Sequence, residues 1–398
     1  MIYKAGPAGF RENAARYFVP RKMGIVDLAQ SGKLLFEPLW REGLNRWKDE
    51  EWESLLYNMK HPEAGAVSMP VEFYILAFRA LDNRLFLNLY WETVRYIRFA
   101  YLSDQESRKK FTDQELDGLS RDDVISLLGQ SFEASYGRAV TDLFSFIEQA
   151  QSEYGMEDAK QVPFYWNIYR QRPQLRYTLA SRILWGIEKG IYPPGTYLPS
   201  LPRMAEHYEV SLNTVRRTLS ILDSMGMTRS FHGKGTLVLT EPEGVDLANP
   251  EIREGMKLYI ESLQLMMLTI KQVVLYTLEH APAYVVEKLK HDVCQLREER
   301  KSYMAFEVVL GFIEQSCGLN LVKECYKKLR ELIVWGYPIV LLRLKERDIH
   351  MEYEGIVALA GRHLQEGNAE AFSHDVKELM GWEYQEVRMF LEHMGAPQ

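Results

Sequence analysis

Hydrophobic residues recur with the spacing of an α-helix along most of this chain, and the alternation typical of β-strands is scarce. In the C-terminal region the predicted helices span residues 251–279, 283–301, 303–316, 319–336, 350–365 and 369–393. Amphipathic helices that follow one another along a chain bury their apolar faces together. The pattern therefore predicts a mainly α protein, with an all-α helical bundle in this region.

The middle of the chain has a different pattern, in which short helices are separated by turns. Apolar residues recur on one helical face over residues 175–187, and this helix is expected to end at Gly190. The Pro-Pro-Gly sequence at 193–195 predicts a turn. Ser200 is placed to cap a second helix, whose first turn contains Pro202, where a backbone N–H is not needed.

A third helix is predicted over residues 212–225, capped by Ser211 and ended by Gly226. Its core face consists of Val215, Leu219 and Leu222. Its opposite face near the start presents Asn213, Thr214, Arg216 and Arg217. Two short strands around residues 232–235, His-Gly-Lys-Gly, complete a hairpin wing. The two arginines alone fit a solvated helix surface, but the order of helix, turn, helix and wing favours a winged helix-turn-helix.

Sequence motifs in this segment resemble those of the GntR family of bacterial transcription regulators. The matching motifs are Gly190-x-Tyr192-Pro193-Pro194-Gly195, Leu198-Pro199-Ser200, Val210-Ser211-x-x-Thr214-Val215-Arg216 and Gly233-Lys234-Gly235-Thr236. The resemblance implies a helix whose N-terminal turns enter the major groove and a wing that reaches the backbone or the minor groove. The expected DNA-binding residues are Ser200, Arg203, Ser211, Asn213, Thr214, Arg216, Arg217, His232, Gly233 and Lys234.

The sequence departs from the family pattern at two positions. Pro202 stands where the family usually has an arginine after the Leu-Pro-Ser motif, and Leu212 replaces the arginine that follows the capping residue. Two lost contacts to guanine or phosphate reduce discrimination by about a few kcal/mol. The operator therefore differs from the family's usual sequence, or binding is weak.

The regions on either side of the winged helix share short similarities in the same order. The similar pairs are 26–29 with 245–248, 41–44 with 253–256, 71–97 with 306–332, and 146–149 with 390–393. This order favours a duplicated helical domain. The expected organisation is a helical domain over 1–160, the winged helix-turn-helix over 161–240 and a second helical domain over 241–398.

The resemblance implies that these flanking regions are all-helical effector domains (FCD or FadR-like) rather than mixed α/β domains. Residues 1–25 are interpreted as a region that retains the remnant of a wing. The two helical domains are expected to pair within one chain, or the protein forms a homodimer that binds a palindrome.

Charge is unevenly distributed along the chain. The net charge is −7, yet residues 161–240 hold ten Lys and Arg and four Asp and Glu, so this segment carries +6 and the remainder −13. A basic module among acidic ones concentrates the attraction to phosphate in one place. Chance clustering remains an alternative from charge alone.

Composition favours a cytoplasmic protein with no membrane span. The chain has three cysteines and no CxxC, its N-terminus lacks the apolar core of a signal peptide, and no run of about 18 uncharged apolar residues occurs. No nucleophile–base pair or phosphate loop stands out, so an enzyme is not expected.

A structural metal and a cofactor are not expected either. Domains of the FCD type often bind a divalent metal through an aspartate and three histidines. The equivalent positions are Ser68 and Glu72 in the first helical domain and Tyr303, Glu307, Tyr353 and Leu379 in the second. The ligand pattern is therefore missing.

The sequence as a whole predicts a DNA-binding transcription regulator whose affinity for a double-stranded operator responds to an unknown small-molecule effector bound in a helical domain. The alternative is a helical scaffold or oligomerisation protein with weak or vestigial DNA binding.

Overall fold

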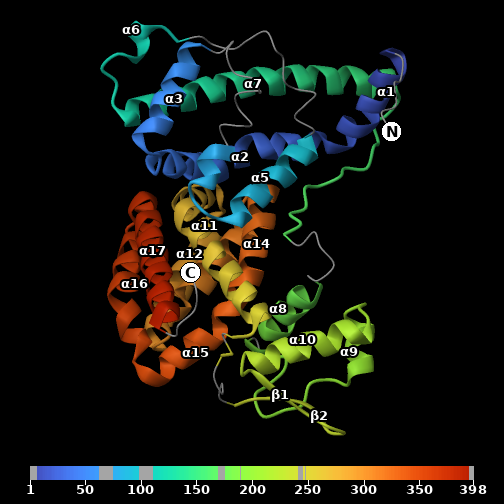
Figure 1. Cartoon of the computed structure of the whole chain (residues 1–398), viewed down its shortest axis with the longest axis vertical. Helices are drawn as coiled ribbons and strands as arrows, with labels where there is room; N and C mark the ends of the chain where they lie inside the picture. Colours follow the sequence, from blue (N-terminus) through green and yellow to red (C-terminus); the bar gives the residue numbers. More distant parts are fainter. Residues whose placement is uncertain are drawn as a thin grey trace. The chain divides into compact units, whose positions relative to one another are not determined.

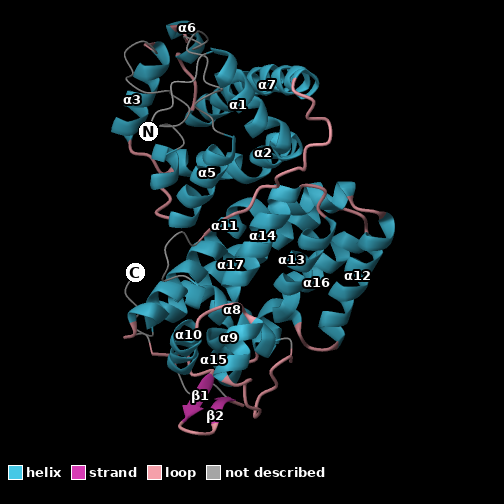
Figure 2. Ribbon diagram, turned by 90° about the vertical axis from the view of Figure 1, so that its right-hand side faces the viewer, coloured by secondary structure: helices cyan, strands magenta, loops and turns pink. Residues whose placement is uncertain are grey.

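The computed structural model describes residues 7–61, 75–97, 111–168, 175–188, 190–240, 245, 246 and 248–393. These residues are mostly helical (Figure 1), and within them the only strands form one two-stranded hairpin (Figure 2). The mainly α fold is thus confirmed. The chain forms two compact units: Met1–Trp166 with Leu319–Val322, and Asn167–Gly318 with Lys323–Gln398. The division into three domains stays a prediction.

The first unit is a group of helices whose apolar faces form one core. Its described elements are α1 (Pro7–Phe18), η1 (Val19–Arg21), α2 (Lys22–Asn45), α3 (Asp49–Lys60), α5 (Arg84–Ile97), α6 (Asp113–Leu116) and α7 (Arg121–Glu153). Helices α1 and α2 both pack against α7, and Leu39 of α2 and Ile147 of α7 are fully buried. This unit extends to Trp166, whose indole N–H donates to Oδ1 of Asn88 at 2.7 Å.

The wing-remnant interpretation of residues 1–25 is wrong for the part that the structure describes. A wing is a β-hairpin, whereas residues 7–25 form α1, η1 and the start of α2. Ala15, Phe18 and Val19 are buried. Since these apolar residues recur at helical spacing, the segment contributes to the helical core instead.

The second unit contains the central segment and a C-terminal bundle. The elements of the central segment are α8 (Leu175–Glu188), α9 (Leu201–His207), α10 (Leu212–Ser224), β1 (Thr228–Phe231) and β2 (Gly235–Val238). Those of the bundle are α11 (Pro250–His280), α12 (Ala283–Glu298), η5 (Ser302–Met304), α13 (Ala305–Ser316), α14 (Asn320–Ile333), η6 (Val334–Gly336), α15 (Tyr337–Glu346), α16 (Ile349–Gln365) and α17 (Ala369–His393).

Helix α11 is the central helix of the bundle and packs most extensively against α17 (Figure 1). Asn249 caps it by accepting a hydrogen bond from the Glu251 N–H, and Pro250 occupies its first turn. By length and composition α11 is apolar enough to cross a membrane, but 67% of its most apolar 18-residue window is buried in the protein. Its apolarity is therefore that of a core helix.

Helix α15 is absent from the helices predicted from the sequence. Gly336 and Pro338 suggest that the helix is interrupted. Proline is compatible with the first turn of a helix, however, and α15 begins at Tyr337. The other predicted C-terminal helices are present with ends shifted by a few residues, and 3-10 turns η5 and η6 occupy two of the shifted ends.

Comparison of the two helical regions gives a mixed result for the proposed repeat. Residues 26–29 lie inside α2, whereas Val245, Asp246 and Ala248 precede α11, so this pair does not mark equivalent positions. Helices α5 and α14, in contrast, have equal lengths and both place buried residues along one face. Their register differs by one residue from the predicted one. The duplication stays a prediction.

The positions that correspond to FCD metal ligands have other partners where the structure describes them. Glu307 pairs with Arg330 at 2.8 Å, and the Tyr353 hydroxyl donates to Glu383. Ser68 and Glu72 lie outside the described residues. Among the residues that the structure does describe, no three His, Cys, Asp or Glu side chains are grouped so as to hold a metal ion.

Candidate nucleic-acid interface

The central segment is built on a small core shared by its three helices. Buried residues from α8 face buried residues from α10, and Met204 of α9 completes the core. The α8 contribution is Leu179, Ile183, Leu184 and Ile187, and that of α10 is Val215, Leu219, Ile221 and Leu222. The apolar face predicted for α10 is thus buried, and its opposite face is left to solvent.

The turn between α9 and α10 is tight. Glu209 adopts a positive φ of 54°, which is uncommon for a residue with a side chain. The hydroxyls of Tyr208 and Tyr192 are hydrogen-bonded at 2.9 Å, which ties the end of α9 to the segment before it. Burial raises the pKa of the Tyr208 phenol, so this hydroxyl remains protonated and able to donate.

Ser211 begins α10 as predicted. Its Oγ accepts a hydrogen bond from the Thr214 N–H at 3.1 Å and lies 2.8 Å from Oγ1 of Thr214. Ser200 occupies the corresponding position before α9, but its side chain makes no capping hydrogen bond. Gly226 follows α10 with a φ of 68°, the left-handed conformation expected of a glycine just after a helix.

The exposed face of α10 carries three of the predicted contact residues. Asn213, Arg216 and Arg217 are exposed, and Thr214 is half-buried. Leu212 joins them on this face, with 42% of its surface exposed. In α9, Ser200 and Arg203 flank the exposed Pro202 near the helix start.

The wing is an antiparallel hairpin in which Phe231 pairs with Gly235 and Thr228 with Val238. His232, Gly233 and Lys234 lie at its exposed tip, where Gly233 has a φ of 75°. The segment before α9 extends this hairpin, since the Leu198 N–H donates to the Thr236 carbonyl at 2.8 Å.

Asp223 links the wing to α10, a role that the sequence analysis missed. Its carboxylate accepts hydrogen bonds from the Thr228 hydroxyl and, at 3.2 Å, from the Ser230 N–H. An acid in the last turn of a helix is unfavourable beside the helix dipole unless it has partners nearby. Thr228 and Ser230 follow Asp223 by only five and seven residues, so the sequence offered a signal for this contact.

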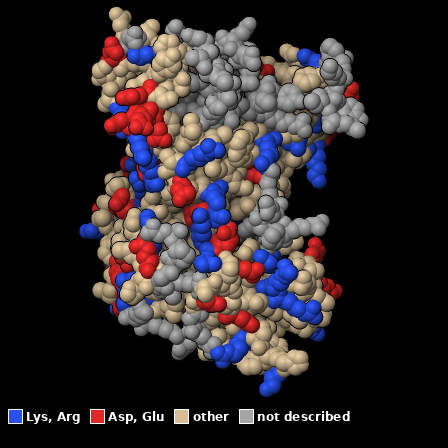
Figure 3. Space-filling view, in the orientation of Figure 1, with Lys and Arg blue, Asp and Glu red and all other residues tan. Residues whose placement is uncertain are grey.

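Basic side chains gather on this part of the protein. Figure 3 shows Lys and Arg over the region of α9 and α10 at the lower right of the view. Exposed Arg203, Arg216, Arg217, Arg229 and Lys234 belong to the central segment. The helix N-termini, exposed cations and wing together form a surface suited to a nucleic-acid backbone and groove.

Residues 175–238 match the family of bacterial regulatory proteins called the gntR family. This segment is a GntR-family helix-turn-helix domain. The chain is 36% identical over 87 residues to the uncharacterized HTH-type transcriptional regulator Rv0494 of Mycobacterium tuberculosis. That alignment covers 22% of this chain and only 34% of Rv0494. The chain is also 27% identical over 104 residues to the uncharacterized HTH-type transcriptional regulator YhcF of Bacillus subtilis, and this alignment covers 26% of this chain and 86% of YhcF.

Solved structures with likeness to the chain include a GntR regulator from Rhodococcus, at 17% identity and a TM-score of 0.30. The alignment covers 56% of this chain and 99% of that one. A GntR protein from Streptococcus agalactiae aligns over 53% of this chain and 99% of its own, at 15% identity and a TM-score of 0.22.

The GntR-family domain is joined to the C-terminal bundle by contacts at both ends. At the start of α8, Arg176 forms an ion pair with Glu251 of α11 at 2.7 Å, and its carbonyl accepts from the Thr218 hydroxyl of α10. The Tyr177 ring lies 5.7 Å from that of Trp335 in η6. These contacts connect α10 to the bundle through α8.

The end of α10 has a second connection to the bundle. Nδ2 of Asn249, the cap of α11, donates to Oγ of Ser224 at 3.0 Å, and the Asp246 N–H donates to the Ser224 carbonyl at 2.8 Å. The orientation of α10 is thus coupled to the first turn of α11.

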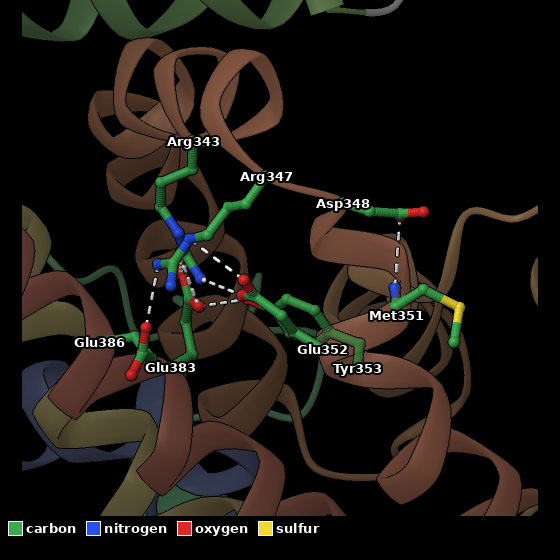
Figure 4. Close-up of polar contacts among 8 residues, drawn as sticks. All are labelled: Arg343, Arg347, Asp348, Met351, Glu352, Tyr353, Glu383 and Glu386. Carbon is green, nitrogen blue, oxygen red and sulfur yellow. Dashed lines mark hydrogen bonds and ion pairs between the residues drawn. The ribbon is translucent and has the colours of Figure 1, made fainter.

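The bundle contains a buried ionic cluster, shown in Figure 4. Arg343 of α15 is fully buried, and its Nη1 lies 3.1 and 3.0 Å from the two carboxylate oxygens of Glu383 in α17. Tyr353 of α16 donates to the same carboxylate. Burial raises the pKa of Glu383, and the positive charge of Arg343 opposes that shift. The cluster ties α15, α16 and α17 together.

Proposed function

We propose that this protein is a sequence-specific DNA-binding transcription regulator of the GntR type. The observation that carries the proposal is the exposed face of α10 with Asn213, Arg216 and Arg217, on a helix whose apolar face is buried. An exposed polar face on a rigidly held helix is what major-groove recognition needs. The names of the relatives, both HTH-type transcriptional regulators, support the same role.

In the proposed complex, the first turns of α10 enter the major groove. Asn213, Arg216 and Arg217 face base edges or flanking phosphates, while Ser211 and Thr214 fix the helix start. Ser200 and Arg203 approach the backbone from the start of α9. His232, Gly233 and Lys234 reach the backbone or minor groove from the wing.

Regulation is proposed to come from a small ligand bound in a helical domain. A ligand shifts a conformational equilibrium only through different affinities for its two states. The contacts of Arg176 with Glu251 and of Tyr177 with Trp335 provide a route by which a change in the bundle reorients α8 and α10. The flanking regions are proposed to be duplicated FCD-like domains.

Assembly and location follow from the same proposal. A palindromic operator needs two winged helices, so we expect a homodimer, with pairing of helical domains within one chain as the alternative. We expect the protein to act in the cytoplasm, as a regulator and not as an enzyme.

A second function, a helical scaffold with vestigial DNA binding, is favoured by one observation. Pro202 and Leu212 leave the starts of both α9 and α10 without the arginines typical of the family. Titration against genomic fragments, including the protein's own promoter, at several salt concentrations separates the two functions. A regulator prefers one fragment and shows a steep salt slope, whereas flat, weak binding to every fragment favours the scaffold.

Arg216→Ala tests the placement of the recognition helix. Loss of one base contact is expected to reduce affinity for the preferred fragment by about tenfold or more without unfolding the domain. The matched control is Arg362→Ala, which removes an exposed arginine from the bundle. Fluorescence anisotropy with the preferred duplex gives both affinities, and circular dichroism reports the fold. Equal affinities for the two variants contradict the placement.

A further inference from the structure

Leu212 is the first residue of α10, and 42% of its surface is exposed. A single exposed leucine on a protein surface usually calls for no explanation. This one stands on the face of α10 that also carries Asn213, Arg216 and Arg217. Its position at the start of that face makes its chemistry relevant to DNA.

Leu212 is not one of the buried residues that form the core of the domain. The core side of α10 consists of the buried Val215, Leu219 and Leu222, and Leu212 borders that side, because it lies three residues before Val215 and seven before Leu219. The helix start is capped by Ser211 and Thr214 through their own hydrogen bonds. Since 42% of its surface is exposed, truncation of Leu212 is expected to destabilise the domain less than truncation of the buried Leu219.

The exposed face of α10 consists of two rows. Residues four apart lie one above the other on a helix, so Leu212 and Arg216 form one row and Asn213 and Arg217 the other. The first member of each row lies at the end of the helix that enters the groove first. Leu212 and Asn213 are therefore the pair expected to reach the base edges most directly.

We propose that Leu212 contacts the C5-methyl group of a thymine and so determines specificity for an A·T pair. A leucine side chain offers no hydrogen bond, and the thymine methyl is the one apolar group on the major-groove edges of the four base pairs. Asn213 fits the same assignment, because its amide can pair with N6 and N7 of adenine. This inference rests on the proposed function, and it names the base that the first turn of α10 reads.

The test begins with selection of preferred duplexes from a random-sequence library by the full-length protein. Each thymine of the selected duplex is then replaced by deoxyuridine, which removes the methyl group and keeps the base pairing. One replacement is expected to weaken wild-type binding about fourfold, the value for loss of one buried methyl group. The other thymines are expected to be insensitive.

Leu212→Ala is expected to weaken binding to the thymine duplex and to lose the response to that deoxyuridine. Arg216→Ala, the matched control on the same row, weakens binding but keeps the response. Selection with Leu212→Arg is expected to replace the thymine by guanine, which presents N7 and O6 to arginine.

The outcomes distinguish the inference from the function on which it rests. A clear preferred duplex with no deoxyuridine effect, or an effect that Leu212→Ala retains, overturns the role of Leu212 and leaves the regulator in place. Selection that enriches no sequence overturns both.

Discussion

The residues of the candidate interface fall into two groups: exposed side chains that can contact DNA, and side chains that hold the start of α10 in place. The hydroxyls of Ser211 and Thr214 are bonded to each other, so one O–H proton is already in use and at most one remains for a phosphate. Asn213, Arg216 and Arg217 are exposed. The sequence motif includes both kinds of residue, and only the structure separates them.

Asp223 is expected to be a positioning residue for the wing. Asp223→Ala removes the acceptor for Thr228 and Ser230, hydrogen bonds of the charge-assisted kind worth about 1.5–3 kcal/mol each. We expect a wing held less firmly, a severalfold loss of DNA affinity and faster hydrogen exchange at the Ser230 amide. Affinity is measured by anisotropy and exchange by mass spectrometry.

The control for this variant is Glu206→Ala, which removes an exposed acid from α9 of the same domain. Loss of a negative charge alone strengthens attraction to DNA. The two variants are therefore expected to shift affinity in opposite directions. A gain in affinity with Asp223→Ala shows that the carboxylate does not hold the wing in a binding position.

Helices that are marked by local periodicity and capping could be predicted from the sequence, whereas those that depend on distant partners could not. Helix α17 begins and ends where its apolar periodicity indicates, and Ser211 and Gly226 mark the ends of α10 by local chemistry. Helix α15 lies among breaker residues, and its Arg343 is buried through partners on α17. Such long-range pairing leaves no local pattern in the sequence.

The ionic cluster between α15, α16 and α17 predicts a large effect on stability. Glu383→Gln leaves the buried Arg343 charge without its main partner and is expected to destabilise the protein by about 3–5 kcal/mol. Replacement of both residues by apolar ones, Arg343→Met with Glu383→Leu, is expected to recover most of this loss. Urea unfolding followed by circular dichroism gives the free energies.

An exposed pair on the same helix provides the comparison. Glu392→Gln breaks the ion pair with Arg388, both of whose side chains are more than 40% exposed, and is expected to change stability by less than about 1 kcal/mol. If Glu383→Gln is equally mild, Arg343 is neutralised by another group, and Glu352 at 3.6 Å is the nearest.

For the molecule as a whole, the location of the GntR-family domain has the greatest consequence for function. It belongs to the same compact unit as the C-terminal bundle. Its basic residues lie in a segment of charge +6, while the rest of the chain carries −13. This charge distribution favours attraction of a nucleic acid to this domain over the rest of the chain. Under the proposed regulation, a signal from the bundle has only to change how α8 and α10 are held.

That coupling predicts a specific result for Tyr177→Ala. Tyr177 is 6% exposed and packs against the fully buried Trp335, so its truncation leaves a cavity between α8 and η6 and costs about 3 kcal/mol or more. We expect amides of α10, such as that of Leu219, to exchange hydrogen faster, while those of α11, such as that of Ile270, keep most of their protection. Tyr284→Ala, at a tyrosine that is 77% exposed, is the matched control and is expected to change neither. If α10 and α11 lose protection equally, the GntR-family domain and the bundle open as one unit. That result contradicts a role of the contact between α8 and η6 in transmitting a change from the bundle to α10.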